Sequence, residues 1–113
     1  MESKELTIVI VSFKSEEKIF DCLKSIPDNI PIIIVENSSN ENLKKSLENR
    51  YKNLKCILTG TNKGYAAGNN IGLRKVRTDY ALVLNPDTIL EKKAIENFLS
   101  TCKKLKDISK KNF

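Results

Sequence analysis

Apolar residues in this chain occur in two alternating patterns. Residues 6–11 and 32–35 are apolar runs rich in β-branched side chains, and residues 54–58 and 80–84 are shorter runs of the same kind. Such unbroken runs are typical of strands buried on both faces. After each run, apolar residues recur three and four positions apart, which is the spacing of an amphipathic helix. The pattern therefore predicts four strands that alternate with four helices.

Capping residues support the predicted helices. Ser15 precedes Glu16 and Glu17, which gives an N-cap and an acidic first turn, and Pro27 marks the end of that helix. Asn40 is the expected cap of the second helix. The four predicted helices cover residues 15–26, 40–51, 65–76 and 91–105.

Strict alternation of strand and helix predicts an α/β fold. We expect a mainly parallel sheet in a three-layer α/β/α, Rossmann-like arrangement, because parallel strands need crossover helices and right-handed crossovers place them on the sheet faces. The 113 residues suffice for one small domain and not for two. We expect the domain to occupy residues 1–105 and the lysine-rich residues 106–113 to form a frayed tail.

Cysteine and histidine content narrows the candidate chemistry. The chain has three widely spaced cysteines and no histidine, which argues against a structural zinc site. Any metal would have to be a hard cation held by oxygen atoms. No run approaches the roughly 18 apolar residues of a membrane span. Residues 1–5 lack the pattern of a secretory signal, so the default location is the cytoplasm.

A net charge of +6 raises nucleic-acid binding as an alternative function. Most of the charge is lysine, scattered along the chain, and lysine is less suited than arginine to reading bases. No RNA-binding or zinc-finger signature is present. We interpret the charge as solvated surface, with no nucleic acid as partner. The same charge can attract phosphate ligands or anionic lipid, and thus favour peripheral association with the inner face of the membrane.

Polar segments follow all four predicted strands. In open parallel sheets, ligands bind beyond the carboxyl ends of the strands. Each segment alone is explained by turn formation or helix capping, whereas four together indicate one crevice. The four segments are residues 12–15, 36–39, 60–64 and 85–88.

Glycine recurs every four residues at Gly64, Gly68 and Gly72. Each glycine inside a helix costs about 1 kcal/mol, so the repeat needs a reason. Close packing on a strand is one explanation, and close approach of a ligand phosphate is the other. The spacing is neither that of the dinucleotide-binding fingerprint nor that of a phosphate-binding loop of nucleotide hydrolases.

Four segments carry a resemblance to a known family: "TIVIVSFKS", "IIIVENSSNE", "TNKGYAAGNNIGLR" and "DYALVLNPDTIL". They resemble the successive motifs of family-2 glycosyltransferases, and above all of their rhamnosyltransferase-like branch, over residues 6–99. The resemblance implies a GT-A domain that binds a nucleotide-diphosphate sugar, such as dTDP-rhamnose or a UDP-sugar. It further implies inverting transfer to a glycan or lipid-linked acceptor in cell-wall polysaccharide biosynthesis.

The resemblance also implies roles for individual residues. The implied nucleotide-binding residues are Val11, Ser12, Phe13, Glu36, Asn37, Asn62 and Gly64. The implied donor-sugar residues are Ala66, Gly68, Asn69, Asp79 and Asn85. Asp87 matches the acid that binds a divalent cation, Mg²⁺ or Mn²⁺, which bridges the diphosphate. The amide of Asn37 can pair with a uracil-like or thymine-like edge.

Two substitutions and the chain length depart from the family pattern. Glu36 replaces the usual Asp, and Lys14 replaces the usual Asn. In the family, the acceptor-binding half and the catalytic base follow the segment matched here, so we identify no catalytic residue. We expect this chain to bind donor weakly, to transfer no sugar, and to expose apolar surface that favours homo-oligomers. The alternatives are a non-catalytic nucleotide-binding remnant and a basic nucleic-acid-binding α/β module.

Overall fold

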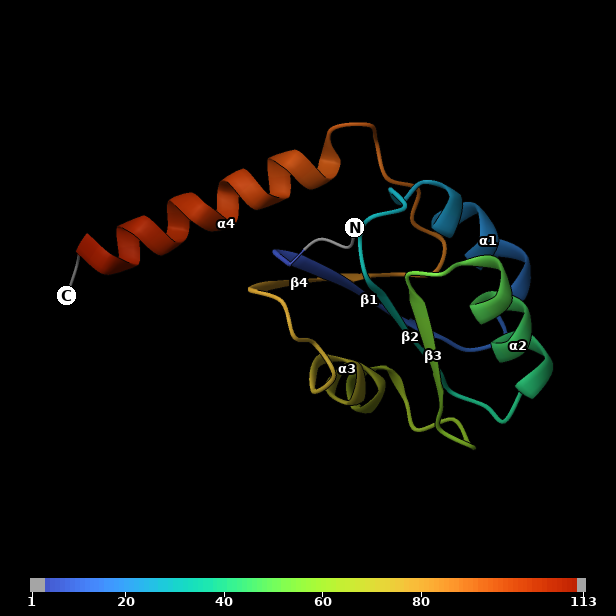
Figure 1. The fold of residues 1–113 in the computed structure, drawn as a ribbon. Coiled ribbons are helices and arrows are strands. Elements are labelled where there is room, and N and C mark those ends of the chain that lie inside the picture. The colour runs from blue at the N-terminus through green and yellow to red at the C-terminus, as the bar shows by residue number, and fades with distance from the viewer. Residues whose placement is uncertain (1–3, 112–113) are drawn as a thin grey trace.

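A computed structural model of the protein describes residues 4–111, with side chains described for residues 4–106. Strands and helices alternate along the chain, which confirms the order predicted from the apolar pattern (Figure 1). The strands are β1 (Leu6–Ser12), β2 (Ile32–Glu36), β3 (Leu54–Leu58) and β4 (Tyr80–Leu84). The helices are α1 (Glu16–Lys24), α2 (Glu41–Arg50), α3 (Tyr65–Leu73) and α4 (Ala94–Lys111).

The four strands form one parallel sheet in the order β3-β2-β1-β4. Ile8 of β1 lies opposite Ile32 on one side and Leu82 on the other. Every residue of β1 and β2 is buried, as expected for central strands covered on both faces. Because all strands run the same way, their carboxyl ends lie at a single edge of the sheet.

Helices cover both faces of this sheet, which confirms the three-layer α/β/α arrangement (Figure 1). On one face α1 and α2 pack over the larger apolar cluster, which includes Ile10 of β1, Ile19 of α1 and Leu47 of α2. On the other face α3 lies over β1 and β2. Val11 and Val35 belong to the smaller cluster on that face.

Helix α3 approaches the sheet closely because two of the residues that face it are glycines. A Cβ atom at Gly68 would lie 2.7 Å from Val11 Cγ1, and one at Gly72 would lie 2.6 Å from Val9 Cγ1. Both distances are shorter than packed carbon atoms allow. Close packing on a strand therefore accounts for these two glycines. Gly64 has a different reason, since its φ of 88° starts α3 from a left-handed conformation.

The two predicted helix caps behave differently. Asn40 Oδ1 accepts a hydrogen bond from the Leu43 N–H at 3.1 Å, as the cap prediction requires. Ser15 occupies the N-cap position of α1, but its Oγ donates to the Phe13 carbonyl oxygen at 3.1 Å. The side-chain cap expected at Ser15 is therefore absent.

Helix α4 begins later and ends later than its apolar spacing predicted. Phe98 and Leu99 in its first turns pack against the larger apolar cluster. The helix then projects beyond the sheet, and Leu105 is 61% exposed (Figure 1). The described part of the expected frayed tail, residues 106–111, is helical. Within residues 4–111, no helix has the length and apolar character needed to cross a bilayer.

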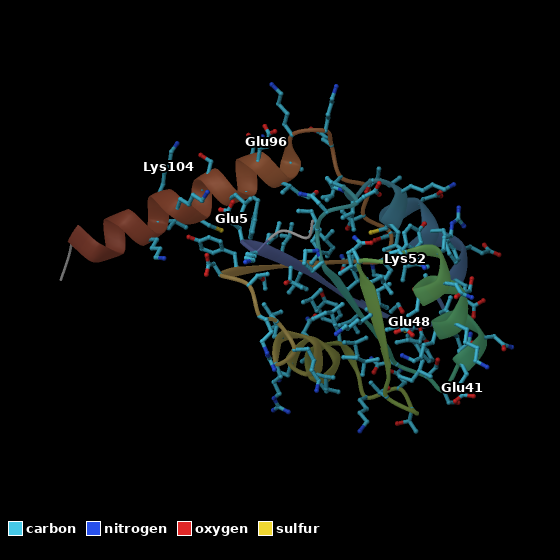
Figure 2. All side chains as sticks on the ribbon, in the orientation of Figure 1. Glu5, Glu41, Glu48, Lys52, Glu96 and Lys104 are labelled. Atoms are coloured by element: carbon cyan, nitrogen blue, oxygen red, sulfur yellow. The ribbon has the colours of Figure 1, made fainter. Side chains whose placement is uncertain are left out.

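The two outer strands differ at their free edges. On β3, Lys44 Nζ donates to the Cys56 carbonyl oxygen at 2.5 Å, and the Cys56 N–H donates to Glu48 Oε2 at 2.9 Å. Lys44 and Glu48 also pair with each other on α2, where Figure 2 labels Glu48. On β4, the only strand neighbour among the described residues is β1. One edge is thus covered by side chains of α2, and the other is open to a further strand.

Candidate functional site

Most of the predicted site residues lie at the carboxyl edge of the sheet. Strands β1 and β2 end at Ser12 and Glu36, which are register partners, and Asn85 follows the end of β4. The loop after β3 leads into α3 at the same edge. The expectation that the polar strand ends share one edge is therefore met.

Ser12 and Glu36 form a buried pair at the centre of this edge. Glu36 is only 3% exposed, and its carboxylate oxygen Oε1 accepts a hydrogen bond from Ser12 Oγ at 2.5 Å. A carboxylate removed from water needs such a donor, because an unpaired buried charge is strongly destabilising. The Asn37 N–H also donates to the Ser12 carbonyl oxygen at 2.8 Å. The ends of β1 and β2 are thus fastened to each other.

Asn37 fastens the next segment to this pair. It is 2% exposed, its Nδ2 donates to the Gly64 carbonyl oxygen at 3.0 Å, and its Oδ1 accepts from Thr59 Oγ1 at 3.1 Å. The side chain therefore holds the loop after β3 against the end of β2. Both polar atoms of this amide already have partners within the protein. Its pairing with a nucleobase stays a prediction.

Thr59 belongs to this network although the sequence analysis did not single it out. Its N–H donates to the Glu36 carbonyl oxygen at 3.1 Å, and its hydroxyl also lies 2.6 Å from the Thr61 carbonyl oxygen. The available signal was its position, because it is the first residue after β3. Its residue type gave no signal, because threonine is common in strands.

The loop after β3 presents its other predicted residues to solvent. Asn62 and Gly64 are exposed, and Asn62 Oδ1 accepts from the Gly64 N–H at 3.0 Å, which stabilises the turn into α3. Ala66 is exposed on the first turn of that helix. Asn69 differs, because its Oδ1 is buried and has no hydrogen-bond partner among the described residues. A buried acceptor without a partner is costly, which sets Asn69 apart from the exposed residues of this loop.

Asn85 and Asp87 lie on a turn that follows β4, and both are exposed. The Thr88 N–H donates to the Asn85 carbonyl oxygen at 3.1 Å, which closes a four-residue turn with Pro86 at its second position. The turn interpretation of this segment is therefore correct. It is compatible with a ligand role, because the Asp87 carboxylate remains accessible.

Helix α1 anchors the segment that carries Asp87. The Leu90 N–H donates to Ser25 Oγ at 3.0 Å, and Cys22 Sγ lies 3.9 Å from the Asn85 carbonyl oxygen. Burial, together with the nearby Asp87 charge, raises the pKa of the Cys22 thiol to about 11. The turn is thus bonded to residues at the end of α1, while the Asp87 carboxylate faces solvent.

The residues directly after β1 reach the same edge from another side. Phe13 is 41% exposed, and Lys14 Nζ lies 5.2 Å from the centroid of its ring. Lys14 has a φ of 53°, in the left-handed region. Asparagine, which the family pattern has at this position, adopts that conformation more readily than lysine.

Val11, Gly68 and Asp79 lie away from the exposed surface of the edge. Val11 is 5% exposed and packs under Gly68, so it supports the edge from within the smaller cluster. Asp79 directly precedes the five-residue strand β4, so it lies at the amino edge of the sheet. A strand of this length spans about 17 Å, so the structure does not bring Asp79 to the other candidates.

The described residues could hold a metal ion only together with a bound ligand that supplies further oxygen atoms. Within residues 4–106, no three carboxylate, thiol or imidazole groups cluster to hold a metal by themselves. Asp87 offers one accessible hard oxygen ligand. Mg²⁺ is commonly held by one or two carboxylates together with water and phosphate oxygens. Asp87 therefore suits a cation that arrives with a diphosphate.

Comparison with known proteins identifies the family of this chain. The family described as glycosyl transferase family 2 matches residues 7–109, and the chain belongs to that family.

Curated relatives are much longer than the matched segment. The chain is 35% identical over 95 residues to the low-salt glycan biosynthesis hexosyltransferase Agl10 of Haloferax volcanii, covering 80% of this chain and 30% of that protein. It is 33% identical over 103 residues to a teichoic acid poly(glycerol phosphate) polymerase of Staphylococcus epidermidis, covering 84% of this chain and 14% of that protein. The chain thus spans less than a third of either relative.

Solved structures show the same fold. Residues 1–349 of S. aureus TarS superpose with a TM-score of 0.73 at 18% identity, covering 88% of this chain and 32% of that one. The same TarS fragment in complex with UDP gives a TM-score of 0.71 at 17% identity, with the same coverage. At these identities the likeness shows the fold alone, and it confirms the predicted GT-A architecture.

Proposed function

We propose that this chain is the donor-binding part of a glycosyltransferase that uses a nucleotide-diphosphate sugar. One observation carries the proposal: a buried polar network and an accessible carboxylate share the carboxyl edge of a family-2 fold. Ligands of open parallel sheets bind at that edge. Relatives named as a hexosyltransferase and a teichoic acid polymerase, and a fold neighbour that binds UDP, support this proposal.

In this proposal the nucleoside lies over the ends of β1, β2 and β3. Glu36 would accept hydrogen bonds from the base or ribose, with Ser12 fixing the orientation of its carboxylate. Glu36 carries one methylene more than the usual Asp, so its carboxylate can reach further toward the ligand. Phe13 would cover one face of the base with its exposed ring.

The diphosphate and sugar would lie between α3 and the turn after β4. Asp87 would hold Mg²⁺ or Mn²⁺ jointly with the diphosphate, and Lys14 would add a positive charge on the side of β1. The cation, when bound, stabilises negative charge on the diphosphate as the glycosidic bond breaks. Asn85 would take hydrogen bonds from sugar hydroxyls. Asn69 would do so once its side chain turns, because its Oδ1, which has no partner among the described residues, is buried.

The finer assignments follow from the family. We propose inverting displacement on dTDP-rhamnose or a UDP-sugar, with a glycan or lipid-linked acceptor in cell-wall polysaccharide synthesis, at the cytoplasmic face of the membrane. This chain would bind donor weakly and transfer no sugar by itself, since the family's catalytic base follows the segment matched here. Sugar transfer by the purified 113-residue chain would contradict that part.

Thermal shift measurements with UDP, dTDP and GDP, with and without Mn²⁺, test donor binding. A ligand that binds the native state raises the melting temperature in proportion to the logarithm of its concentration over Kd. We expect a shift with UDP or dTDP that is larger with Mn²⁺, and its loss in Asp87→Asn. Asp79→Asn is the matched control, because it removes an exposed acid at the opposite edge. Equal losses in both variants, or no shift with any nucleotide, would contradict the proposal.

A further inference from the structure

A hollow of about 680 Å³ opens at the amino edge of the sheet, opposite the candidate site. Its walls come from the start of β1, the turns before β2 and β3, and the segment after α3. Five cationic residues line it, and no acidic residue does so among those described. We call this hollow the basic groove; its cations are Lys4, Lys52, Lys55, Lys75 and Arg77.

No ion pair among residues 4–106 involves a cation of the basic groove. Within the described residues, the two ion pairs join Lys44 to Glu48 and Lys103 to Glu5, and neither involves a groove cation. Three acids lie beside the lining residues: Glu5 follows Lys4 in the chain, Asp79 follows Thr78, and the charge of Lys55 helps to lower the pKa of Glu48. Like charges around a concave surface concentrate their field inside it, which favours an anion there.

The chemistry of the lining favours phosphate over nucleobases. The lining contains no aromatic side chain, and stacking on aromatic rings is what holds single-stranded bases. Four of the five cations are lysines, which bind phosphate as point charges. Arg77 is partly engaged already, because its Nη1 donates to the carbonyl oxygens of Arg74 and Val76, each at 3.0 Å.

The cations stand on separate walls of the groove. Lys52 follows the carboxyl end of α2, at the opposite end of the helix from Glu41 (Figure 2). Lys75 follows α3 on the other face of the sheet. A flat bilayer surface meets cations that share one protruding plane, whereas a chain with repeated phosphates can lie between walls. We propose that the basic groove binds a polyanion that carries several phosphate groups in a chain.

This site is independent of the proposed donor site. The two lie at opposite ends of the strands, about 17 Å apart for a five-residue strand. A polyanion in the basic groove therefore leaves the carboxyl edge accessible to a nucleotide. Loss of one activity with retention of the other distinguishes the two proposals.

Binding of fluorescently labelled inorganic polyphosphate to the purified chain at low salt tests the proposal. The groove variant is Lys52→Gln/Lys75→Gln, which replaces two exposed side chains without removing a hydrogen bond that the structure shows. The control is Lys93→Gln/Lys104→Gln, which removes the same charge outside the groove, with Lys104 on α4 (Figure 2). We expect binding to weaken about tenfold in the groove variant and about twofold or less in the control.

Each alternative occupant has a defined outcome. Equal weakening in both double variants would overturn the groove, since binding would then depend on net charge alone. Tighter binding of single-stranded DNA of equal charge would assign the groove to nucleic acid and overturn the phosphate-chain proposal. Binding to phosphatidylglycerol vesicles without binding to polyphosphate would overturn it in favour of a membrane surface. The melting shift with UDP and Mn²⁺ should be unchanged in the groove variant.

Discussion

The carboxyl edge of the sheet has two halves of different construction. At the ends of β1, β2 and β3, Glu36 and Asn37 are 3% and 2% exposed and bonded to their neighbours. After β4, Asn85 and Asp87 are exposed on a turn, and the hydrogen bonds of that turn are made by its backbone. The side chains of the first half are fixed in place by folding, whereas those of the second half are free to reorient around a ligand.

This difference separates stability from binding. A buried network that is satisfied within the protein is already organised before a ligand arrives, so a ligand need not order it. Changes to that half should lower the free energy of unfolding. Changes to the exposed half should alter ligand affinity and leave the free energy of unfolding nearly constant.

The largest expected effect is on the packing that supports the buried half. Gly68→Ala would bring a Cβ atom to 2.7 Å from Val11 Cγ1 and force α3 away from the sheet. We expect the free energy of unfolding to fall by about 3 kcal/mol, at the upper end of overpacking effects. Urea denaturation measures the change. Asn70→Ala, at an exposed position of the same helix, is the control and should change stability by less than about 0.5 kcal/mol.

The next effect compares an asparagine from each half. Asn37→Ala removes the partner of the Gly64 carbonyl oxygen and of the Thr59 hydroxyl, so we expect a loss of about 2 kcal/mol in stability. Asn85→Ala, on the exposed turn, should cost less than about 0.5 kcal/mol. Both are read from the same denaturation experiment. Similar losses at the two positions would show that the halves do not differ as the structure indicates.

The smallest effect concerns Lys14, whose left-handed conformation lies next to the edge. Lys14→Asn should stabilise the protein by about 0.5 to 1 kcal/mol, because asparagine tolerates this conformation better. The same change should weaken nucleotide binding if the Lys14 charge faces the phosphates. Lys18→Asn, within α1, is the control and should be slightly destabilising, because asparagine is the poorer helix former. Stabilisation by both variants would rule out the conformational explanation.

Much of the fold could be predicted because its signals are local. The apolar runs at Leu54–Leu58 and Tyr80–Leu84 coincide with β3 and β4. The shared edge also followed from the pattern, since parallel strands place their carboxyl ends together. Asp79 was grouped with the donor-sugar residues by motif alone, and its position before β4 places it at the other edge.

The internal bonding of the site could not be predicted in the same way. The partners of Asn37 are Thr59 and Gly64, which lie 22 and 27 residues away and reach it only because the loop after β3 returns to β2. The basic groove has the same origin, since Lys4, Lys52 and Lys75 are scattered in sequence and meet only in the folded sheet.

The two outer strands, β3 and β4, differ in whether they can accept a further strand. Lys44 and Glu48 occupy the backbone groups of Cys56 that another strand would need, which leaves β4 as the outer strand beside which a strand could be added. Two copies joined through β4 would make one continuous sheet that ends in β3 on both sides. Such an assembly would close as a symmetric pair and could not lengthen into a fibre.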